Sequence, residues 1–158
     1  MKKTLIIIIF ILVSFISYGQ SEPLPNPEAY FSAIIVNDIE TSISWYSNNF
    51  GFKVLNKIKS EEKGFKQANL KCGNMLMELI ELESSLSPKS LLENHPKKTK
   101  IDGFFKFGFL VSEFEKWVDA LKQSKVEFYG DVVTDNLSGK KMLIIKDPDG
   151  NRIQIFEK

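Results

Sequence analysis

The order of apolar and polar positions divides the chain from Tyr30 onward into two units of the same kind. In the first unit, an apolar-rich segment is followed by Asp38, a good helix N-cap, and by apolar residues at helical spacing. Three alternating segments bounded by turn residues come next. The predicted elements are a strand over Tyr30–Val36, a helix over Ile39–Asn49, and strands over Phe52–Ser60, Gly64–Lys71 and Met75–Leu82.

The second unit repeats this order. Ser112 and Glu115 have the spacing of a capping box, which predicts that a helix begins between them. The predicted elements are a strand over Phe104–Val111, a helix over Glu113–Ser124, and strands over Val126–Val133, Lys140–Lys146 and Arg152–Glu157. The pattern therefore predicts an α+β fold of two tandem βαβββ modules, over residues 30–82 and 104–158, within one domain over residues 30–158.

The last two predicted strands are joined by a tight turn, Asp147-Pro-Asp-Gly-Asn151. Asp and Asn side chains bond back to their own backbone, Pro presets φ, and Gly supplies the positive φ that a reversal needs. The chain is therefore predicted to end in a β-hairpin that carries Gln154 on its second strand.

The connector over residues 83–103 is polar and contains His95, the one His of the chain. Loops longer than about 12 to 15 residues are often functional, which makes this segment a candidate lid or pocket rim. A plain tether between two modules is the favoured explanation, since a duplicated fold needs a connector. We expect His95 to be solvated, and we expect Glu81 and Glu83 to be solvated residues at the strand edge.

The N-terminus is typical of a bacterial export signal. Lys2 and Lys3 precede an apolar run from Leu5 to Val13, and small residues follow before Gln20. The run is shorter than the ~20 residues of a membrane-spanning helix, so cleavage is favoured over a permanent anchor. We predict a signal peptide over residues 1–19, an extended Pro-rich leader over residues 20–29, and a periplasmic or secreted mature protein.

Charge and cysteine content exclude some classes of function. The formal net charge is +1, and removal of Lys2 and Lys3 would lower it to −1, with acids and bases interspersed. Such a balance argues against nucleic acid as a partner. Cys72 is the one Cys, so neither an intrachain disulfide nor a thiolate metal cluster is expected, and we expect Cys72 to pack beside a turn.

Taken together, the two modules, the segment Val36-Asn-Asp38-Ile-Glu-Thr-Ser-Ile-Ser-Trp-Tyr46 and the closing turn resemble the vicinal oxygen chelate superfamily. This group contains glyoxalase I, extradiol dioxygenases, methylmalonyl-CoA epimerase and the bleomycin- and fosfomycin-resistance proteins. The resemblance implies a curved mixed sheet around a cleft, with the helices on the outer face. It also implies possible pairing as a homodimer, because many relatives form their clefts across chains.

Metal enzymes of that superfamily hold a divalent ion on four side chains in the cleft. By the resemblance these positions fall at Phe31, Glu78, Lys106 and Gln154. Phe has no donor atom, Lys ligates only when neutral, and a Gln carbonyl is a poor substitute for a carboxylate. Glu78 alone retains a ligand type, so we expect no metal and no cofactor.

Strand alternation assigns side chains to the two faces of the sheet. We expect Phe105, Phe107 and Phe109 to pack beneath the second helix. The residues expected to face the cleft are Phe31, Ala33, Ile35, Leu76, Glu78, Ile80, Lys106, Gly108, Leu110, Arg152, Gln154 and Phe156.

Three functions fit this cleft. In the first, the protein binds a small, partly apolar molecule without metal, and Lys106 and Gln154 orient a carboxylate or carbonyl of the ligand. In the second, it is a glyoxalase-like or dioxygenase-like lyase or isomerase, in which Glu78 abstracts a proton beside a carbonyl that Lys106 polarises. In the third, Phe31 fills the cleft of an interaction domain. Lys106 and Glu78 are also expected to neutralise one another, since a buried carboxylate is costly unless paired.

Overall fold

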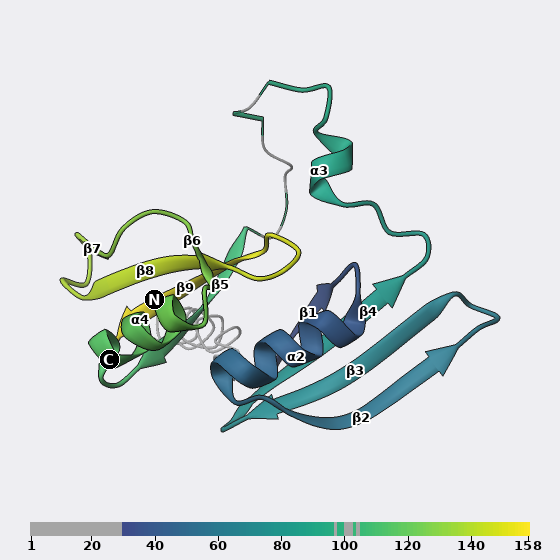
Figure 1. The fold of residues 1–158 in the computed structure, drawn as a ribbon, viewed down its shortest axis with the longest axis horizontal. Coiled ribbons are helices and arrows are strands. Elements are labelled where there is room, and N and C mark those ends of the chain that lie inside the picture. The colour runs from purple at the N-terminus through teal and green to yellow at the C-terminus, as the bar shows by residue number, and fades with distance from the viewer. Residues whose placement is uncertain (1–29, 97, 100–102, 104) are drawn as a thin grey trace, which may run out of the picture.

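The computed structural model describes residues 30–96, 98–99, 103 and 105–158 (Figure 1). The predicted signal peptide over residues 1–19 and the predicted leader over residues 20–29 lie outside the described residues. The described strands form one sheet of four and one sheet of five, which confirms the predicted α+β class and divides the strands between two sheets.

The first module is a sheet in the order β1-β4-β3-β2 with one helix. β1 pairs with β4 in parallel, and the other pairs are antiparallel. The elements are β1 (Phe31–Ile35), α2 (Ile39–Phe50), β2 (Lys53–Ser60), β3 (Phe65–Cys72) and β4 (Met75–Leu82). Each bound lies within one residue of its predicted position.

Two acidic side chains hold the start of α2. Asp38 Oδ1 accepts a hydrogen bond from the Thr41 backbone N–H at 2.7 Å, as its predicted N-cap role requires. Glu81 Oε2 accepts one from the Ile39 N–H at 2.8 Å, and Glu81 Oε1 pairs with the Lys66 ammonium at 2.6 Å. The expectation that Glu81 is a solvated edge residue is therefore wrong, because β4 ends beside the free N–H groups of the helix.

The second module is a sheet in the order β5-β9-β8-β6, with β7 also paired to β8. Its elements are β5 (Lys106–Val111), α4 (Phe114–Gln123), β6 (Glu127–Phe128), β7 (Val133–Thr134), β8 (Lys141–Lys146) and β9 (Arg152–Glu157). The continuous strand predicted over Val126–Val133 is wrong. Gly130 has a φ of 97°, which an extended strand does not use, so the chain leaves β8 after β6 and returns at β7.

The start of α4 also differs from its prediction. Glu113, not Ser112, is the N-cap; its φ is 56° and its side chain makes no capping hydrogen bond. Because the helix begins one residue late for a capping box, Glu115 falls at the second helical position. There its carboxylate pairs with the Lys141 ammonium on β8.

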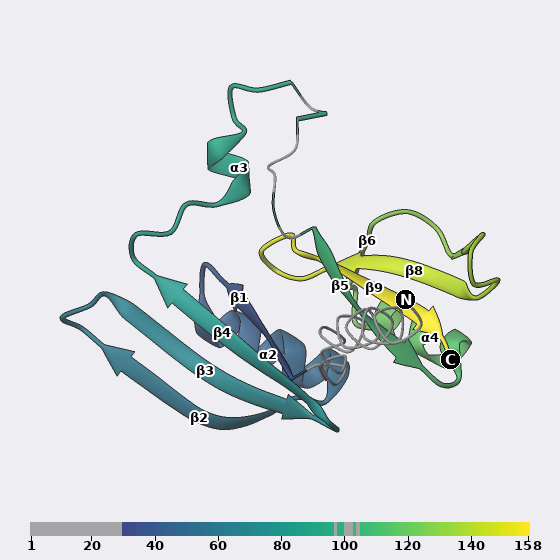
Figure 2. The same ribbon diagram turned by 180° about the vertical axis from the view of Figure 1, so that it is seen from behind.

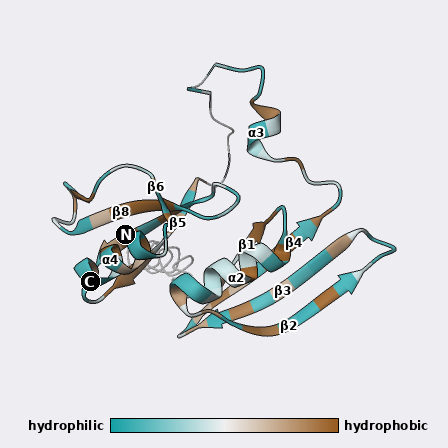
Figure 3. Ribbon diagram, viewed as in Figure 1, coloured by the Kyte–Doolittle hydropathy of each residue, from teal (hydrophilic) through white to brown (hydrophobic). Residues whose placement is uncertain are grey.

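The core lies between each helix and the inner face of its sheet. Figure 3 shows hydrophobic and hydrophilic residues mixed along β2 and β3; Ala68 and Leu70 of β3 are buried on the covered face, whereas β2 is exposed along nearly its whole length. Fully buried apolar residues include Val36, Leu70, Met77, Leu79, Leu121, Leu143, Ile145, Ile153 and Ile155. No helix in the described part of the chain has the length and apolar character to cross a bilayer.

Aromatic side chains join the two modules. Phe50, at the end of α2, stacks on Phe109 of β5 with ring centroids 4.9 Å apart and on Trp117 of α4 at 5.6 Å. Phe52 meets Phe109 edge-on at 6.3 Å. Phe109 thus packs inward as predicted, although against α2 of the other module as well as beneath α4.

A polar contact joins the closing turn to the first module. The Tyr46 hydroxyl, on a fully buried side chain, donates a hydrogen bond to Asp147 Oδ2 at 2.9 Å. Asp149 Oδ1 accepts from the Asn37 N–H at 3.0 Å, and Asp149 Oδ2 accepts from the Ser42 hydroxyl at 3.3 Å. The turn that was predicted only to reverse the chain therefore also docks one module on the other.

Candidate functional site

The sheet faces opposite the helices carry the residues that the sequence places in a cleft. β1 and β5 are edge strands, and the two edges face one another across the middle of the molecule (Figures 1 and 2). The face alternation is as predicted along β1, where Phe31, Ala33 and Ile35 are exposed and Ile34 is buried. The four predicted site residues are divided between the two sheets.

Phe31 and Glu78 lie together on the first module. They line a pocket of about 380 Å³ with residues of β2 and β3, including Leu55 and Asn69. Phe31 keeps 58% of its surface exposed, so it does not fill a closed cavity. The third hypothesis, in which Phe31 plugs the cleft, is therefore not supported at this position within one chain.

Glu78 has a partner other than the expected one. Its Oε1 accepts a hydrogen bond from the Gln67 amide on the neighbouring strand β3. Among the described residues, no hydrogen bond or ion pair connects Glu78 with Lys106. The Gln67 amide, and not the Lys106 ammonium, is therefore the partner of the Glu78 carboxylate.

Lys106 lies in a second pocket of about 520 Å³, between the modules. One wall comes from the end of β1 and the residues after it, and another from the start of the connector. The lining residues include Ala33, Ile35, Asn37, Ser84, Ser85, Leu86, Pro88, Phe105, Lys106, Asp149, Asn151 and Arg152. The two pockets have no lining residue in common, because Phe31 is at the start of β1 and Lys106 is beside its end.

The connector contributes to this pocket at its first residues. Residues 84–88 line it, and a short helix, α3 (Pro88–Leu91), begins there with Ser87 as its N-cap. Ser87 Oγ accepts from the Ser90 backbone N–H at 3.1 Å. His95 is exposed, as expected. The start of the connector is thus a wall of this pocket.

Arg152 is a residue of this pocket to which the sequence analysis assigned a face but no role. Its guanidinium carbon lies 4.5 Å from the Phe105 ring centroid and 4.3 Å from that of Tyr129. Arg152 Nε is buried and has no hydrogen-bond partner. Phe105 is 54% exposed, so the expectation that it packs beneath α4 is wrong. Phe105 lies immediately before β5, so its side chain does not follow the alternation of that strand.

Strand register places three cations in a row across the second sheet. Lys106 of β5 is opposite Arg152 of β9, and Arg152 is opposite Lys146 of β8. Lys146 pairs with the Glu127 carboxylate on β6. Neither Lys106 nor Arg152 forms an ion pair among the described residues. The pKa of Asp135 is lowered chiefly by hydrogen bonds from Ser138 and in smaller part by the Lys106 charge, so one carboxylate lies within electrostatic range of Lys106.

Gln154 does not reach either pocket. It is only 5% exposed, and its amide nitrogen contacts Met142 Sδ on β8. Its backbone lies close to Gly108 of β5, where a Cβ atom would stand 2.8 Å from the Gln154 carbonyl oxygen. Gln154 is therefore a packed residue of the sheet within this chain.

Burial shapes the electrostatics of the closing turn. Burial raises the pKa of Asp147, and this effect exceeds the lowering by its hydrogen bonds from Asn151 and Tyr46. Burial, together with the neighbouring Asp147 carboxylate, raises the pKa of Tyr46 far above its ordinary value. Both groups hold their protons more firmly than in water, which is typical of a structural contact.

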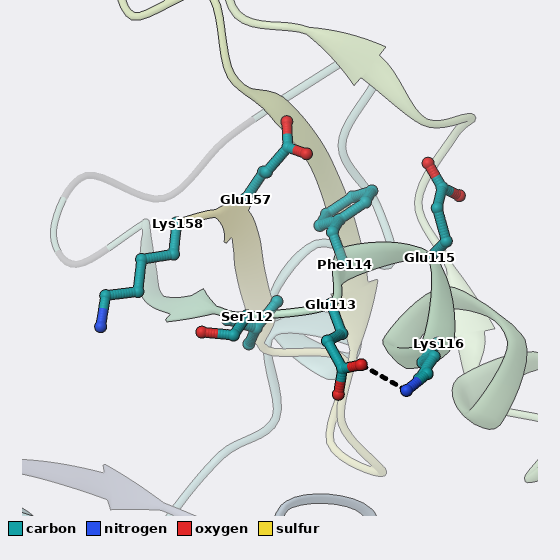
Figure 4. A pocket seen from close by; sticks show the side chains of 8 residues that line it. Ser112, Glu113, Phe114, Glu115, Lys116, Glu157 and Lys158 are labelled. Carbon is teal, nitrogen blue, oxygen red and sulfur yellow. Dashed lines mark hydrogen bonds and ion pairs between the residues drawn. The ribbon is translucent and has the colours of Figure 1, made fainter.

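Another hollow, of about 540 Å³, lies where α4 begins (Figure 4). Its lining includes Phe114, Glu157 and Lys158, and the Glu113 carboxylate pairs with the Lys116 ammonium at its rim. In Figure 4 the Lys158 and Glu157 side chains point in different directions instead of toward a common point. This hollow carries no constellation for chemistry.

Comparison with known proteins now identifies the family. Residues 30–155 match the model of the Glyoxalase/Bleomycin resistance protein/Dioxygenase superfamily. The chain belongs to this superfamily. Over 125 residues it is 28% identical to "Uncharacterized protein YwkD" of Bacillus subtilis (strain 168), a match that covers 79% of this chain and 92% of that protein.

Solved structures of the glyoxalase superfamily share the fold. A glyoxalase family protein from Enterococcus faecalis superposes with a TM-score of 0.65 at 22% identity, covering 82% of this chain and 94% of that one. Lactoylglutathione lyase from Agrobacterium tumefaciens superposes with a TM-score of 0.60 at 18% identity, covering 85% and 96%. At these identities the likeness concerns the fold alone.

The four positions at which metal enzymes of the superfamily carry ligands do not fit a metal here. Phe31 offers no donor, the Glu78 carboxylate is engaged by Gln67, and the Gln154 amide is packed against Met142. The structure also places Phe31 and Glu78 at one pocket and Lys106 at another.

Proposed function

We propose that this member of the glyoxalase superfamily is an exported, metal-independent protein that binds a small, partly apolar molecule. The observation that carries the proposal is the pocket of about 520 Å³ between the end of β1, the start of β5 and residues 84–88. Its volume lies within the roughly 300 to 1,000 Å³ of pockets for small ligands, and it combines apolar walls with a few polar groups.

The apolar part of this pocket comes mainly from the first module and the connector. Ala33 and Ile35 contribute from β1, and Leu86 and Pro88 from the segment after β4. Ile35 is 54% exposed and Leu86 69% exposed, although both are apolar. Covering such surface with a ligand is favourable by about 25 cal/mol per Å² of apolar area, which gives the pocket a driving force for binding.

Binding without metal is tested by elemental analysis of protein purified without chelators. We expect zinc, nickel and iron far below one equivalent per chain, because the four positions offer one carboxylate and that carboxylate is hydrogen-bonded to Gln67. One equivalent of any of these metals, retained through gel filtration, would contradict this part of the proposal.

A lyase or isomerase remains the second candidate and requires a second copy of the chain. Glu78 and Lys106 line different pockets, so one chain does not present both to one substrate. A homodimer in which the first module of one copy meets the second module of the other would bring these residues together. Turnover would then depend on both Glu78 and Lys106, and it would fall with dilution below the dimer dissociation constant.

Native mass spectrometry tests the binding function most directly, because it reports retained ligand, metal and stoichiometry together. We expect a mass excess in the range of a small organic molecule, lost on gentle activation, or else a complex formed on adding compounds that stabilise the protein in a thermal-shift screen. If neither small acids nor aromatic compounds raise the melting temperature and no mass excess is found, the proposal fails.

Export is tested separately. We expect the mature protein to begin at Gln20 and to be found in the periplasm or the medium when the full chain is produced in a bacterial host. N-terminal sequencing checks the cleavage position, and cell fractionation checks the compartment. An intact Met1 in the cytoplasmic fraction would contradict export without bearing on the pocket.

A further inference from the structure

We propose that Lys106 and Arg152 form a carboxylate-binding end of the pocket between the modules, so that the ligand is an organic acid with an apolar or aromatic body. This inference rests on the proposed binding function and specifies the ligand class. It assigns a role to Arg152, which lies outside the four positions that correspond to metal ligands in the superfamily.

Arg152 is held in one orientation before any ligand arrives. Its guanidinium lies between the rings of Phe105 and Tyr129, at 4.5 Å and 4.3 Å from their centroids. Stacking between two rings restricts rotation of the planar group but leaves its edge available for hydrogen bonds. A fixed fork of N–H donors suits a carboxylate, which accepts two parallel hydrogen bonds.

The donors of this group are not used within the described residues. Arg152 Nε is buried without a hydrogen-bond partner, so a ligand does not reach it in this conformation. The terminal Nη groups are not among the buried unpartnered atoms, and no described residue accepts a hydrogen bond from them. The Nη groups are therefore the donors that a ligand carboxylate would meet.

The positive charges on neighbouring strands of the second sheet also favour an anion at this position. Lys106, Arg152 and Lys146 occupy adjacent register positions on β5, β9 and β8. Lys146 is paired with Glu127, whereas neither Lys106 nor Arg152 forms an ion pair among the described residues, and Lys106 has only a minor electrostatic interaction with Asp135. Like charges on neighbouring strands repel, so an anion between Lys106 and Arg152 would stabilise the sheet as well as the complex.

Among the described residues, the one carboxylate in the pocket lining, that of Asp149, offsets only one of these two positive charges. Asp149 is turned to the first module, where its two oxygens accept from the Asn37 N–H at 3.0 Å and the Ser42 hydroxyl at 3.3 Å. Asp149 is thus occupied with docking the closing turn. Lys106 and Arg152 keep a net positive charge at the pocket.

The apolar residues of the pocket walls favour an organic acid over an inorganic anion. Ala33, Ile35, Leu86 and Phe105 line the pocket and would be covered by an apolar ligand body. Phosphate or sulfate would gain the charge contacts and leave this surface in water. A carboxylate with an apolar body gains both contributions.

The test compares phenylacetate with its neutral analogue phenylacetamide by isothermal titration calorimetry on the mature chain. We expect phenylacetate to bind about ten- to a hundredfold more tightly, as a charge-assisted pair of hydrogen bonds would produce. Inorganic phosphate serves as a third probe and is expected to bind more weakly than phenylacetate. Binding of phosphate at equal affinity would overturn the organic-acid assignment.

The variants identify the residues. Arg152→Gln removes the charge, and Arg152→Lys keeps a charge while losing the planar fork; we expect losses in phenylacetate affinity of about a hundredfold and about tenfold. Lys106→Gln is at an exposed position and should lose about tenfold without affecting folding. Lys141→Gln, on β8 beside Glu115, is the matched control and should leave affinity unchanged.

The outcomes separate this inference from the function on which it rests. If phenylacetamide binds as well as phenylacetate, and Lys106→Gln and Arg152→Gln leave both affinities unchanged, the pocket binds small molecules but the carboxylate site is wrong. If none of the probes binds the wild-type chain, the carboxylate site is also wrong, and the native mass measurement then decides whether the binding function survives. Circular dichroism of each variant confirms that a loss of affinity does not come from unfolding.

Discussion

The two modules share the order of their elements but differ in how their helices begin and in what their open faces carry. In the first module, Asp38 and Glu81 both accept hydrogen bonds from the start of α2. In the second, α4 begins at Glu113 in a left-handed conformation without a side-chain cap. The second module therefore forms its helix without a side-chain cap, because other contacts hold α4 in place.

The open faces differ as well. The first module contributes exposed apolar residues such as Ile35 at the end of β1, and its carboxylate Glu78 is satisfied locally by Gln67. The second contributes Lys106 and Arg152, which lie opposite one another on β5 and β9 and form no ion pair among the described residues. The pocket between the modules therefore takes apolar surface mainly from the first module and positive charge from the second.

The largest effect should come from breaking the aromatic contact between the modules. Phe50→Ala removes a side chain that is 6% exposed and stacks on both Phe109 and Trp117, so we expect a loss of about 3 to 4 kcal/mol in the free energy of unfolding. Phe50→Leu is the control and should cost about half as much. Urea unfolding measures both. A loss below about 1 kcal/mol for Phe50→Ala would mean that the modules do not support one another.

The polar contact between the modules should be next in size. Asp147→Ala leaves the fully buried Tyr46 hydroxyl without its acceptor, and we expect a loss of about 2 to 3 kcal/mol in the free energy of unfolding. Asp149→Ala breaks an exposed hydrogen bond from the Asn37 N–H and a long one, at 3.3 Å, from the Ser42 hydroxyl, and should cost about 1 kcal/mol. Equal losses for the two variants would contradict the special role of the buried pair.

A substitution at the start of α4 should raise the free energy of unfolding by about 1 kcal/mol. Glu113→Gly should raise the free energy of unfolding by that amount, because φ is 56° there and Gly adopts this conformation without strain. Glu115→Gly, two residues later in the regular helix, should instead lower it by about 1 kcal/mol. Thermal unfolding of both variants checks the opposite signs. If Glu113→Gly does not stabilise the protein, the start of α4 is not the weaker of the two helix starts.

The smallest effect concerns acid stability. The Lys66 ammonium and the Ile39 N–H lower the pKa of Glu81, so its contribution is present above pH 4.5 and is lost as the pH falls through the lowered folded-state pKa. Asp147 has a raised pKa, so its contribution has the opposite sign: it is present below pH 3.8 and is lost as the pH rises through the raised value.

Unfolding measured between pH 3 and pH 6 separates these two contributions. Glu81→Gln should flatten the fall in stability on acidification, because the pH-dependent contribution of the first module is removed. Asp147→Asn should make that fall steeper, because an opposing contribution is removed. Identical pH profiles for the wild type and both variants would show that neither carboxyl group controls acid stability.

Most of the fold could be predicted because it depends on local patterns. The bounds of the first module follow from alternation, the Asp38 cap and turn residues, all of which act over a few residues. The wrong predictions concern the strand over Val126–Val133 and the Ser112 cap. There the deciding features are the positive φ values of Gly130 and Glu113, which depend on how the surrounding chain folds and not on a local pattern of residues.

The candidate site could be predicted only in part. Alternation correctly places Phe31 and Lys106 on open faces, and the resemblance to the superfamily points to Glu78 and Gln154 as well. The contacts of Arg152 could not be predicted, because its aromatic neighbours come from before β5 and after β6 and no spacing in the sequence associates them with it. Glu81 was misjudged for the same reason, since its partner Ile39 is 42 residues away.

The sequence by itself determined the order of the elements, the faces of their strands, the closing turn and the poor set of metal donors, because residue chemistry and short-range periodicity are enough for these. The tertiary structure decided that Lys106 lies beside Arg152 and the start of the connector, while Glu78 lies with Phe31 in another pocket. That division depends on how two sheet edges dock through Phe50, Tyr46 and the closing turn, and docking is set by contacts between residues far apart in the chain.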